Sequence, residues 1–592
     1  MCGINSIISW ASEDLSRDID RMNQPIIHRG PNDGGYTNLS NEEYSIGLGM
    51  RRLSIIDTEN STQPMSCGKT GDIIVYNGEI YNFRELRNSL KTEHDLSFET
   101  DGDTEVLLKG LQIYGESFIR DLDGMFAFVY FSAQSDTLIL ARDTYGEKPL
   151  YIYREDKKIL IASEIKSIKS YNGVNLSLNE EALSLYFSLT YIPAPHTIYN
   201  EIDKIERSSI VKIDLLKKSL IKYSYTANIP SNIKEDNIYN IVENSVRSRM
   251  ISDVPLGAFL SGGIDSGIVT GLASRQQDQS LDVFSVFFEN HVYDESDRII
   301  KMADYHNCNL HSVVIGEKDL LAGLEDVLRN FDQPFADSSA IPSALIMKHA
   351  SRTKKVILSG DGGDEMFYGY NKHRMFLMPR VLRDTGRYFP SFLRHTDTVI
   401  SKLQKSDNRG VLYKTSKFLK SISSCSPYIN LLSLGMSEQE LNAIWKKSNR
   451  TRIQNLYLEP SNIVEASRLD KDVSLDGDLL PKVDMTAMYS SLEVRSPFLN
   501  TSIEYWSNRY PFKNHINLNQ GKLLLRENFK DLFPANYLNA PKKGFGIPIG
   551  EFLRGPLKMR LYELIELIDK EMYSILDMDP VRRQFEMHMD RS

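Results

Sequence analysis

The chain of 592 residues is long enough for about four domains of ~150 residues, or for fewer large ones. Hydrophobic residues make up 41% and charged residues 25%, which is typical of a soluble globular protein, and the net charge of −9 argues against a nucleic-acid or anionic-membrane partner. No apolar run approaches the ~20 residues of a membrane span. The N-terminus, MCGINSIISWASED, lacks the basic region and long apolar stretch of a secretion signal.

Cysteine spacing predicts neither a disulfide framework nor a zinc site, because no CxxC pair occurs. The four cysteines are Cys2, Cys67, Cys308 and Cys425. We therefore expect the protein to be in a reducing cytoplasm.

Cys2 is a candidate nucleophile. If Met1 is removed, the Cys2 thiol can attack a substrate while its own α-amine, with a pKa near 8, takes the proton. A cysteine at position two is commonly a coincidence, so the interpretation depends on the segments that follow. These are residues 28–31 (HRGP), 52–57 (RLSIID), 77–82 (NGEIYN) and 103–107 (DTEVL).

Each of these segments also has a simple structural explanation. Asn77 and Gly78 could form a hairpin turn, Arg52 could be a surface charge, and Asp103 could cap a helix. Together and in this order, the segments resemble the glutaminase domain of the class II, N-terminal-nucleophile glutamine amidotransferases. The resemblance implies that Cys2 attacks the glutamine amide. It also implies an oxyanion hole formed by Asn77 and Gly78, a carboxylate clamp by Arg52, and an α-ammonium site at Glu79 and Asp103.

Short apolar segments at 122–130, 138–143, 146–152 and 161–166 are rich in β-branched and aromatic residues and predict stacked sheets. The resemblance implies a four-layer αββα sandwich over residues 2–190. Turn-rich sequences at 191–195 and 228–231 predict a linker over 191–235, too apolar for a free tether, so we expect two closely packed domains.

After residue 235, strands and helices alternate. Strands are expected to end at Leu260 and to span 282–288, 311–315 and 355–358, with helices between them. This order predicts a doubly wound parallel sheet over 236–592, an α/β domain with added helices, whose ligands lie beyond the carboxyl ends of the strands. The region 380–470 is interpreted as structural.

Residues 261–266 (SGGIDS) follow a strand and open a helix, so they can direct main-chain N–H groups at a phosphate. Asp265 beside phosphates indicates a Mg²⁺ ligand. Residues 359–365 (SGDGGDE) also follow a strand, which suggests one shared pocket in which Asp265 and Asp364 bind one Mg²⁺. Each segment alone could be an ordinary glycine-rich turn.

The SGGIDS segment resembles the pyrophosphate loop of the N-type ATP pyrophosphatases, and no Walker A sequence occurs. With residues 293–296, 332–337, 484–499 and 542–546, it completes a resemblance to the glutamine-hydrolysing asparagine synthetase family over nearly the whole chain. The resemblance implies charge stabilisation by Lys543 and ATP binding by Leu260, Ser261, Gly262, Gly263, Asp265, Ser266, Val286, Ser359 and Gly360.

The sequence thus predicts a two-site enzyme that takes ammonia from glutamine and transfers it to a carboxylate activated by ATP, with ATP and Mg²⁺ as cofactors. L-Aspartate is the expected acceptor. Asp361 stands where many members of the family have glutamate, at the acceptor site, and its shorter side chain leaves open another carboxylate such as a uronic acid.

Two further alternatives are a β-lactam-synthetase-like ligase, which would typically lack the N-terminal cysteine, and a non-enzymatic protein of the same fold. A homodimer is one assembly compatible with the sequence.

Overall fold

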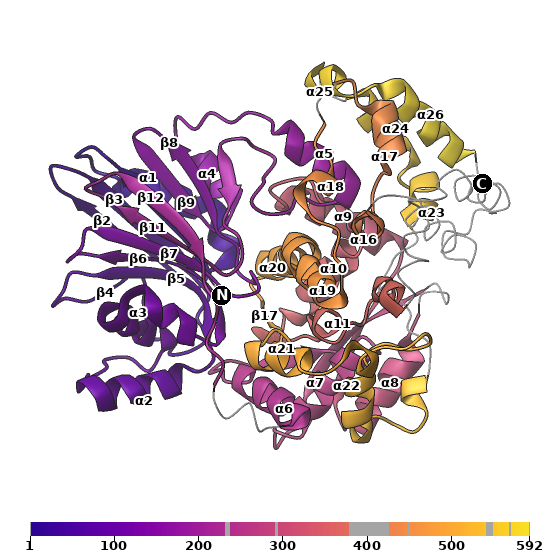
Figure 1. Cartoon of the computed structure of the whole chain (residues 1–592), viewed down its shortest axis with the longest axis horizontal. Helices are drawn as coiled ribbons and strands as arrows, with labels where there is room; N and C mark the ends of the chain where they lie inside the picture. Colours follow the sequence, from indigo (N-terminus) through magenta and orange to yellow (C-terminus); the bar gives the residue numbers. More distant parts are fainter. Residues whose placement is uncertain are drawn as a thin grey trace.

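The computed structural model describes residues 2–230, 237–289, 294–377, 426–447, 450–539, 549–567 and 570–590. Figure 1 shows two halves side by side: strand layers formed by the first part of the chain, and a helix-rich half formed by the rest. Among the described residues, no helix is long and apolar enough to cross a membrane.

The N-terminal half contains two six-stranded antiparallel sheets, with strand orders β10-β8-β9-β1-β3-β2 and β12-β11-β7-β6-β5-β4. The strands of the first sheet are β1 (Cys2–Ser9), β2 (Asp33–Ser40), β3 (Ser45–Arg52), β8 (Tyr151–Glu155), β9 (Lys158–Ala162) and β10 (Ile202–Lys204). Those of the second are β4 (Met65–Ser66), β5 (Ile73–Ile80), β6 (Gly124–Ser132), β7 (Thr137–Arg142), β11 (Ser209–Asp214) and β12 (Ser219–Ser224).

Successive side chains along each strand point to opposite faces of its sheet. One face of each sheet packs against the other sheet, and the outer face packs against helices, which gives four layers. Ile4 and Ile8 of β1 pack with Val75 of β5 between the sheets. On the outer faces, Ile7 packs against α1 (Ser16–Asn23), whereas Tyr76 packs against α3 (Asp103–Tyr114). Helix α4 (Ile165–Ser170) lies with α1, and α2 (Phe83–His94) lies beside α3. The predicted αββα sandwich is confirmed.

The structure corrects the predicted linker. Residues 202–204 pair with β8, and residues 209–224 form a hairpin that pairs with β7, so much of the segment 191–235 completes the two sheets. The reason is burial: Ile210, Val211 and Ile213 are apolar and need a sheet core to cover them. Helix α5 (Glu180–Leu189), expected to close the first domain, packs its buried Leu183 with Leu441 and Trp445 of the C-terminal half.

The C-terminal half is built on a five-stranded parallel sheet with the order β15-β14-β13-β16-β17. Its strands are β13 (Leu256–Phe259), β14 (Asp282–Phe288), β15 (Asn309–Ile315), β16 (Val356–Leu358) and β17 (Glu493–Arg495). One face is covered by α6 (Ile238–Arg249), α7 (Ile264–Ser274) and α8 (Ser296–Tyr305). The other is covered by α9 (Glu317–Asn330), α10 (Ala340–Ala350) and α20 (Leu480–Tyr489). The doubly wound sheet is confirmed.

The strand order places the reversal point between β13 and β16. The chain runs from β13 outward through β14 to β15, whereas β16 and β17 lie on the opposite side of β13. Ligands of such sheets bind in the crevice outside the carboxyl ends of the strands at this point. The segments 261–266 and 359–365 begin one or two residues after these two strands, so both border this crevice.

Further helices complete this half. They are α11 (Gly363–Met366), α16 (Pro427–Leu432), α17 (Glu438–Ile444), α18 (Ile453–Leu456), α19 (Ile463–Asp470), α21 (Thr501–Asn508), α22 (Leu523–Asn528), α23 (Ile549–Arg554), α24 (Lys558–Glu566), α25 (Lys570–Ile575) and α26 (Met578–Met589). Among them, α17, α25 and α26 pack with α5 rather than with the sheet. A π-helical segment, Lys471–Leu479, joins α19 to α20 and ends just before Pro481, which cannot donate a helical hydrogen bond.

Candidate active sites

The pairing of β1 with β3 places Cys2 directly opposite Arg52. Both residues are buried, and burial raises the pKa of the Cys2 thiol. At neutral pH the group is therefore protonated and needs a base before it can attack. The prediction that its own α-amine is this base depends on removal of Met1, which lies outside the described residues.

Asn77 and Gly78 lie inside β5 rather than in a turn, which excludes the hairpin interpretation. The Asn77 Oδ1 atom accepts a hydrogen bond from the Cys2 main-chain nitrogen at 2.9 Å. Its Nδ2 group is buried and, within the described part of the chain, donates to no acceptor. A buried amide donor without a partner is costly, so Asn77 Nδ2 is available to a ligand oxygen next to Cys2. A Cβ at Gly78 would lie 2.0 Å from the Met125 main-chain oxygen, which accounts for glycine there.

Glu79 and Asp103 are both buried carboxylates. Glu79 Oε2 accepts from Arg495 Nη2 at 3.0 Å, whereas its Oε1 is buried and accepts from no donor among the residues that the structure describes. Asp103 Oδ2 accepts from the Tyr76 hydroxyl at 2.8 Å and from the Ile80 main-chain nitrogen at 2.9 Å. Burial, and then the charge of Asp103, raise the pKa of Glu79 well above its usual value. A bound ammonium group would offset both effects.

Arg52 is held by the loop that follows it. Its guanidinium donates to the main-chain oxygens of Ile56, Asp57 and Thr58 at 3.3, 2.8 and 3.0 Å. These bonds use three of its five N–H donors, so two remain for a carboxylate. The glutamine-binding role of Arg52 stays a prediction, but its position opposite Cys2 excludes the interpretation as a surface charge.

Replacing Asn77 with alanine should lower the kcat of glutamine hydrolysis by about 10²- to 10³-fold, the usual cost of one oxyanion-hole donor. The measurement is glutamate release under saturating glutamine. A matched control is Asn82→Ala, which removes an amide bonded to the main chain of Asp121 and Asp123, two residues beyond the end of the same strand. Equal losses in the two variants would contradict the oxyanion role.

In the C-terminal half, the loops after β13 and β16 touch. A Cβ at Gly360 would lie 2.6 Å from the Ser266 nitrogen, and a Cβ at Gly363 would lie 2.6 Å from the Asp265 carboxylate. Only glycine allows this approach. Within the first loop, Ser266 Oγ accepts from the Ser261 nitrogen at 3.2 Å, and the main chain at Gly262 has a φ of +73°. The N-terminus of α7 thus faces the second loop.

Lys522 joins the two loops and was missed from the sequence. Its Nζ bonds to Asp265 Oδ2 and lies 2.6 Å from Asp364 Oδ1. Burial alone would lower the pKa of Lys522, but the carboxylates of Asp265 and Asp364 raise it. The residue has a left-handed conformation with φ of +56°, which is uncommon for a residue other than glycine. No spacing pattern in the sequence could have found it.

Two carboxylates that both pair with one ammonium group could instead both bind a divalent cation, whose positive charge would take the place of the Lys522 charge. The predicted Mg²⁺ ligands, Asp265 and Asp364, are therefore brought together. Among the described residues, no cluster of three or more His, Cys, Asp or Glu residues could hold a metal ion, so the remaining ligands would come from phosphate and water.

Other basic side chains missed from the sequence surround the first loop. Arg298 donates to the Gly262 oxygen from Nε at 3.3 Å and from Nη2 at 3.1 Å, and Tyr537 donates to the same oxygen at 2.9 Å. Arg298 also lies over the Tyr537 ring, 4.2 Å from its centroid. Arg526 follows Lys522 on α22 and interacts with the charges of Asp265 and Arg298. These cations suit a polyphosphate.

Three of the remaining predicted synthetase residues lie on or beside strands of the parallel sheet. Asp361 Oδ2 accepts from Ser359 Oγ at 2.8 Å, and burial raises the pKa of Asp361. Leu260 directly follows β13, and Val286 lies on β14; both are buried. Lys543 lies outside the described residues, as does much of the region 380–470.

Comparison with known protein families shows two matching domains. The asparagine synthase model matches residues 237–592, and the glutamine amidotransferase domain model matches residues 1–225, ending just after β12. The chain belongs to the asparagine synthase family.

Relatives in this family span most of the chain. It is 31% identical to an asparagine synthetase [glutamine-hydrolyzing] 1 of Bacillus subtilis, over 97% of this chain and 91% of the relative. It is 37% identical to a putative asparagine synthetase of Methanocaldococcus jannaschii, over 69% and 82%. Among solved structures, the match to a glutamine phosphoribosylpyrophosphate amidotransferase of B. subtilis covers 62% of this chain and 77% of that chain, at 15% identity. Its TM-score of 0.29 is too low to carry an argument.

In this asparagine synthase family member, buried ion pairs join the two halves. Arg29 is fully buried and donates to Asp484 at 2.8 and 3.0 Å, to Glu164 at 2.8 Å and to the Cys2 oxygen at 3.1 Å. Arg142 donates to Asp476 at 2.7 Å. Because an unpaired buried charge is expensive, Arg29 fixes the strand that carries Cys2 against α20, and Arg142 fixes the end of β7 against the π-helical segment.

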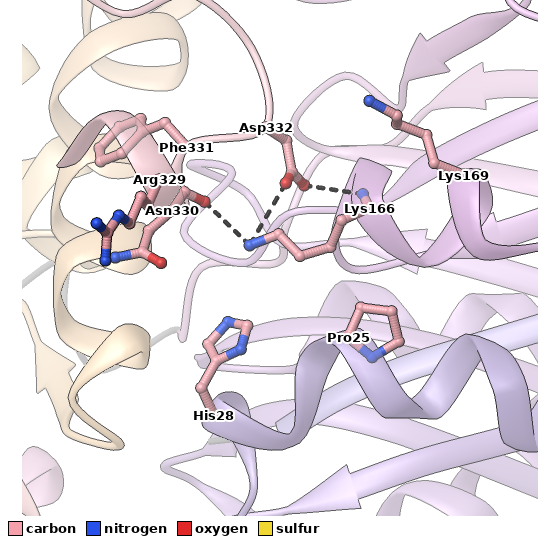
Figure 2. A pocket seen from close by; sticks show the side chains of 8 residues that line it. All are labelled: Pro25, His28, Lys166, Lys169, Arg329, Asn330, Phe331 and Asp332. Carbon is pink, nitrogen blue, oxygen red and sulfur yellow. Dashed lines mark hydrogen bonds and ion pairs between the residues drawn. The ribbon is translucent and has the colours of Figure 1, made fainter. Parts of the chain in front are cut away.

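The pocket in Figure 2 lies at the outer edge of this seam and measures about 370 Å³. Lys166 crosses it, donating to the Asn330 oxygen at 2.9 Å and lying 3.4 Å from Asp332 Oδ1. His28 on the opposite wall lies 3.1 Å from Glu164. None of the predicted site residues lines this pocket, so it belongs to the contact between the halves rather than to either candidate active site.

Proposed function

We propose that the protein is an ATP-dependent amidotransferase that converts L-aspartate to L-asparagine with glutamine as the nitrogen donor. The observation that carries this proposal is the presence in one chain of two complementary sites: a buried thiol beside an unpaired amide donor, and two glycine-rich acidic loops that meet at the reversal point of a parallel sheet. The names of the relatives support aspartate as the acceptor over a uronic acid.

In the first site, the Cys2 sulfur attacks the carboxamide carbon of glutamine after its proton passes to the α-amine. Asn77 Nδ2 and the Gly78 N–H stabilise the oxyanion, while Arg52, Glu79 and Asp103 hold the α-carboxylate and α-ammonium groups. Collapse of the intermediate releases ammonia and leaves a glutamyl thioester. Water then hydrolyses this thioester to glutamate and restores the thiol.

In the second site, the acceptor carboxylate attacks the α-phosphorus of ATP and expels pyrophosphate, which gives an acyl-adenylate. The main-chain groups of 261–266, with Ser359 and Gly360, hold the phosphates, and Lys522 and Arg298 neutralise their charge. Asp265 and Asp364 would hold Mg²⁺, which supplies charge stabilisation for the leaving pyrophosphate. Ammonia attacks the acyl carbon, and AMP leaves. Asp361 is proposed to take a proton from the attacking amine, and Lys543 is proposed to stabilise charge on the adenylate.

Ammonia must reach the second site without protonation, since ammonium is not a nucleophile. A buried apolar cluster of Tyr81, Met125 and Met488 crosses the seam next to Gly78 and supports a route closed to water. A reducing cytoplasm suits the reaction because Cys2 acts only as a free thiol. Homodimer formation stays a prediction.

The proposed function is tested by supplying purified protein with glutamine, ATP, Mg²⁺ and a series of carboxylates. We expect L-aspartate to give pyrophosphate and AMP in step with asparagine. Pyrophosphate release with a uronic-acid nucleotide sugar but not with aspartate would overturn the acceptor assignment. ADP and phosphate as products would overturn the interpretation of the nucleotide site.

A further inference from the structure

The Arg495 guanidinium lies at the junction of the two candidate active sites. Arg495 ends β17, the strand next to β16, and is fully buried. Its Nε donates to Glu493 Oε1 at 2.6 Å, and its Nη1 donates to the main-chain oxygens of Arg249 and Ile251 at 2.9 and 2.6 Å. Its Nη2 reaches across the seam to Glu79 Oε2 at 3.0 Å.

On the glutaminase side, this contact determines where the Glu79 carboxylate lies. Glu79 is two residues beyond Asn77 on β5, so both side chains point to the same face of the strand. One Glu79 oxygen is occupied by Arg495, and the other is the buried, unpaired oxygen that we assign to the glutamine α-ammonium. Any displacement of Arg495 therefore moves a proposed glutamine ligand.

On the synthetase side, Arg495 also holds the loop after β16, residues 359–365. The Arg495 main-chain oxygen accepts from the Ser359 nitrogen at 2.9 Å. The hydroxyl groups of Ser496 and Ser359 lie 3.2 Å apart, and Ser359 Oγ donates to Asp361 at 2.8 Å. Hydrogen bonds thus link Asp361 to Ser359, Ser359 to the Arg495 main chain, and the Arg495 side chain to Glu79.

We propose that Arg495 is a positioning residue that couples occupancy of the synthetase site to glutamine binding. Nucleotide and acceptor bound at residues 359–361 reposition Ser359, and the rigid strand β17 carries this change through the Arg495 guanidinium to Glu79. This inference rests on the proposed function. Balancing the buried charges of Glu79 and Glu493 would require only the Arg495 guanidinium. The proposed role also requires the hydrogen bond between the Arg495 main chain and Ser359.

The experiment measures the KM for glutamine from glutamate release, with and without saturating Mg·ATP and L-aspartate. In the wild type, we expect occupancy to lower this KM about fivefold or more, the lower end of ordinary coupling between sites. In Arg495→Lys the charge remains but the fork that reaches Glu79, Glu493 and two carbonyl groups is lost, so the ratio of the two KM values should approach one. Ser496→Ala should also reduce the ratio, because it weakens the link to Ser359 without touching Glu79.

An equilibrium measurement tests the reverse direction, since coupling between two binding sites is reciprocal. L-Glutamate carries the same α-ammonium group as glutamine and should tighten ATP binding, as followed by titration calorimetry. Arg495→Lys should remove this effect. The matched control is Arg207→Lys, which alters an ion pair with Asp472 across the same seam, at 2.8 Å, without contact to either loop. Its KM ratio should equal that of the wild type.

A wild-type ratio of one would overturn the proposal. The proposal would also be overturned if Arg495→Lys and Ser496→Ala both kept the same ratio of KM values as the wild type. If Arg495→Lys does not fold, Ser496→Ala alone decides. If the role of Arg495 were purely structural, Arg495→Lys would have a lower melting temperature but the same ratio of KM values as the wild type. Failure of the proposed function would be seen differently, as no pyrophosphate release with aspartate; the ratio is then measured with Mg·ATP alone, and the same outcomes apply.

Discussion

Replacing Cys2 with alanine should abolish glutamine-dependent asparagine formation and leave formation from ammonium salts intact. We expect glutamate release to fall by about 10³-fold or more, because the variant lacks the nucleophile altogether. The synthetase loops lie in the other half of the molecule and do not contact Cys2, so ATP cleavage in the presence of ammonium should continue. The two activities are measured in parallel, as glutamate release and pyrophosphate release.

Cys67 provides a stringent control for this prediction. Although burial opposes it, hydrogen bonds from Gln112 and Thr70 lower the pKa of Cys67 to about 7, whereas the pKa of Cys2 is raised. On thiol acidity alone, Cys67 would be the more reactive group. We nevertheless expect Cys67→Ala to retain glutaminase activity, because Asn77 lies beside Cys2. Loss of activity in Cys67→Ala, or its retention in Cys2→Ala, would contradict the assignment of the nucleophile.

Replacing Asp265 or Asp364 with asparagine should reduce synthesis by about 10²-fold or more, whether glutamine or ammonium supplies the nitrogen. The reason is that a bound Mg²⁺ contributes several kcal/mol of charge stabilisation, and each 1.36 kcal/mol is tenfold in rate. Each substitution also leaves the Lys522 ammonium group with one carboxylate partner instead of two. Glutamate release in the absence of ATP should be unchanged.

The control for this second prediction is Asp282→Asn. Asp282 begins β14, at the opposite end of the same sheet, and pairs with Lys354 and His311. Its replacement should leave synthesis near the wild-type rate at saturating Mg²⁺. In the two site variants, the apparent affinity for Mg²⁺ should fall with the rate. A rate loss in Asp265→Asn and Asp364→Asn that is independent of Mg²⁺ concentration would contradict their assignment as metal ligands.

Much of the fold could be predicted because it depends on local patterns. The strand at 282–288 is a nearly continuous apolar run, typical of a strand buried on both faces, and the structure has the same bounds. The alternation of strands and helices after residue 235 predicted the doubly wound sheet. Residues 202–224 are strand-like in sequence, but the sequence analysis assigned them to a linker. Their pairing partners, such as β7, lie far away in the chain, so no local pattern indicates the pairing.

The sequence by itself determined which residues carry the candidate chemistry: Cys2 and Asn77 in one half, Asp265, Asp361 and Asp364 in the other. These could be named because residue type and short spacing, read with the family resemblance, limit what a glycine-rich loop or a terminal cysteine can do.

Only the tertiary structure decided how these residues meet. It placed β16 beside β13, so that the two acidic loops touch, and it brought Lys522 between Asp265 and Asp364 from more than 150 residues further along the chain. It also connected Glu79 to Ser359 through Arg495. Contacts between distant segments arise from the burial of whole strands and helices against one another, and single-residue spacing contains no information about that packing.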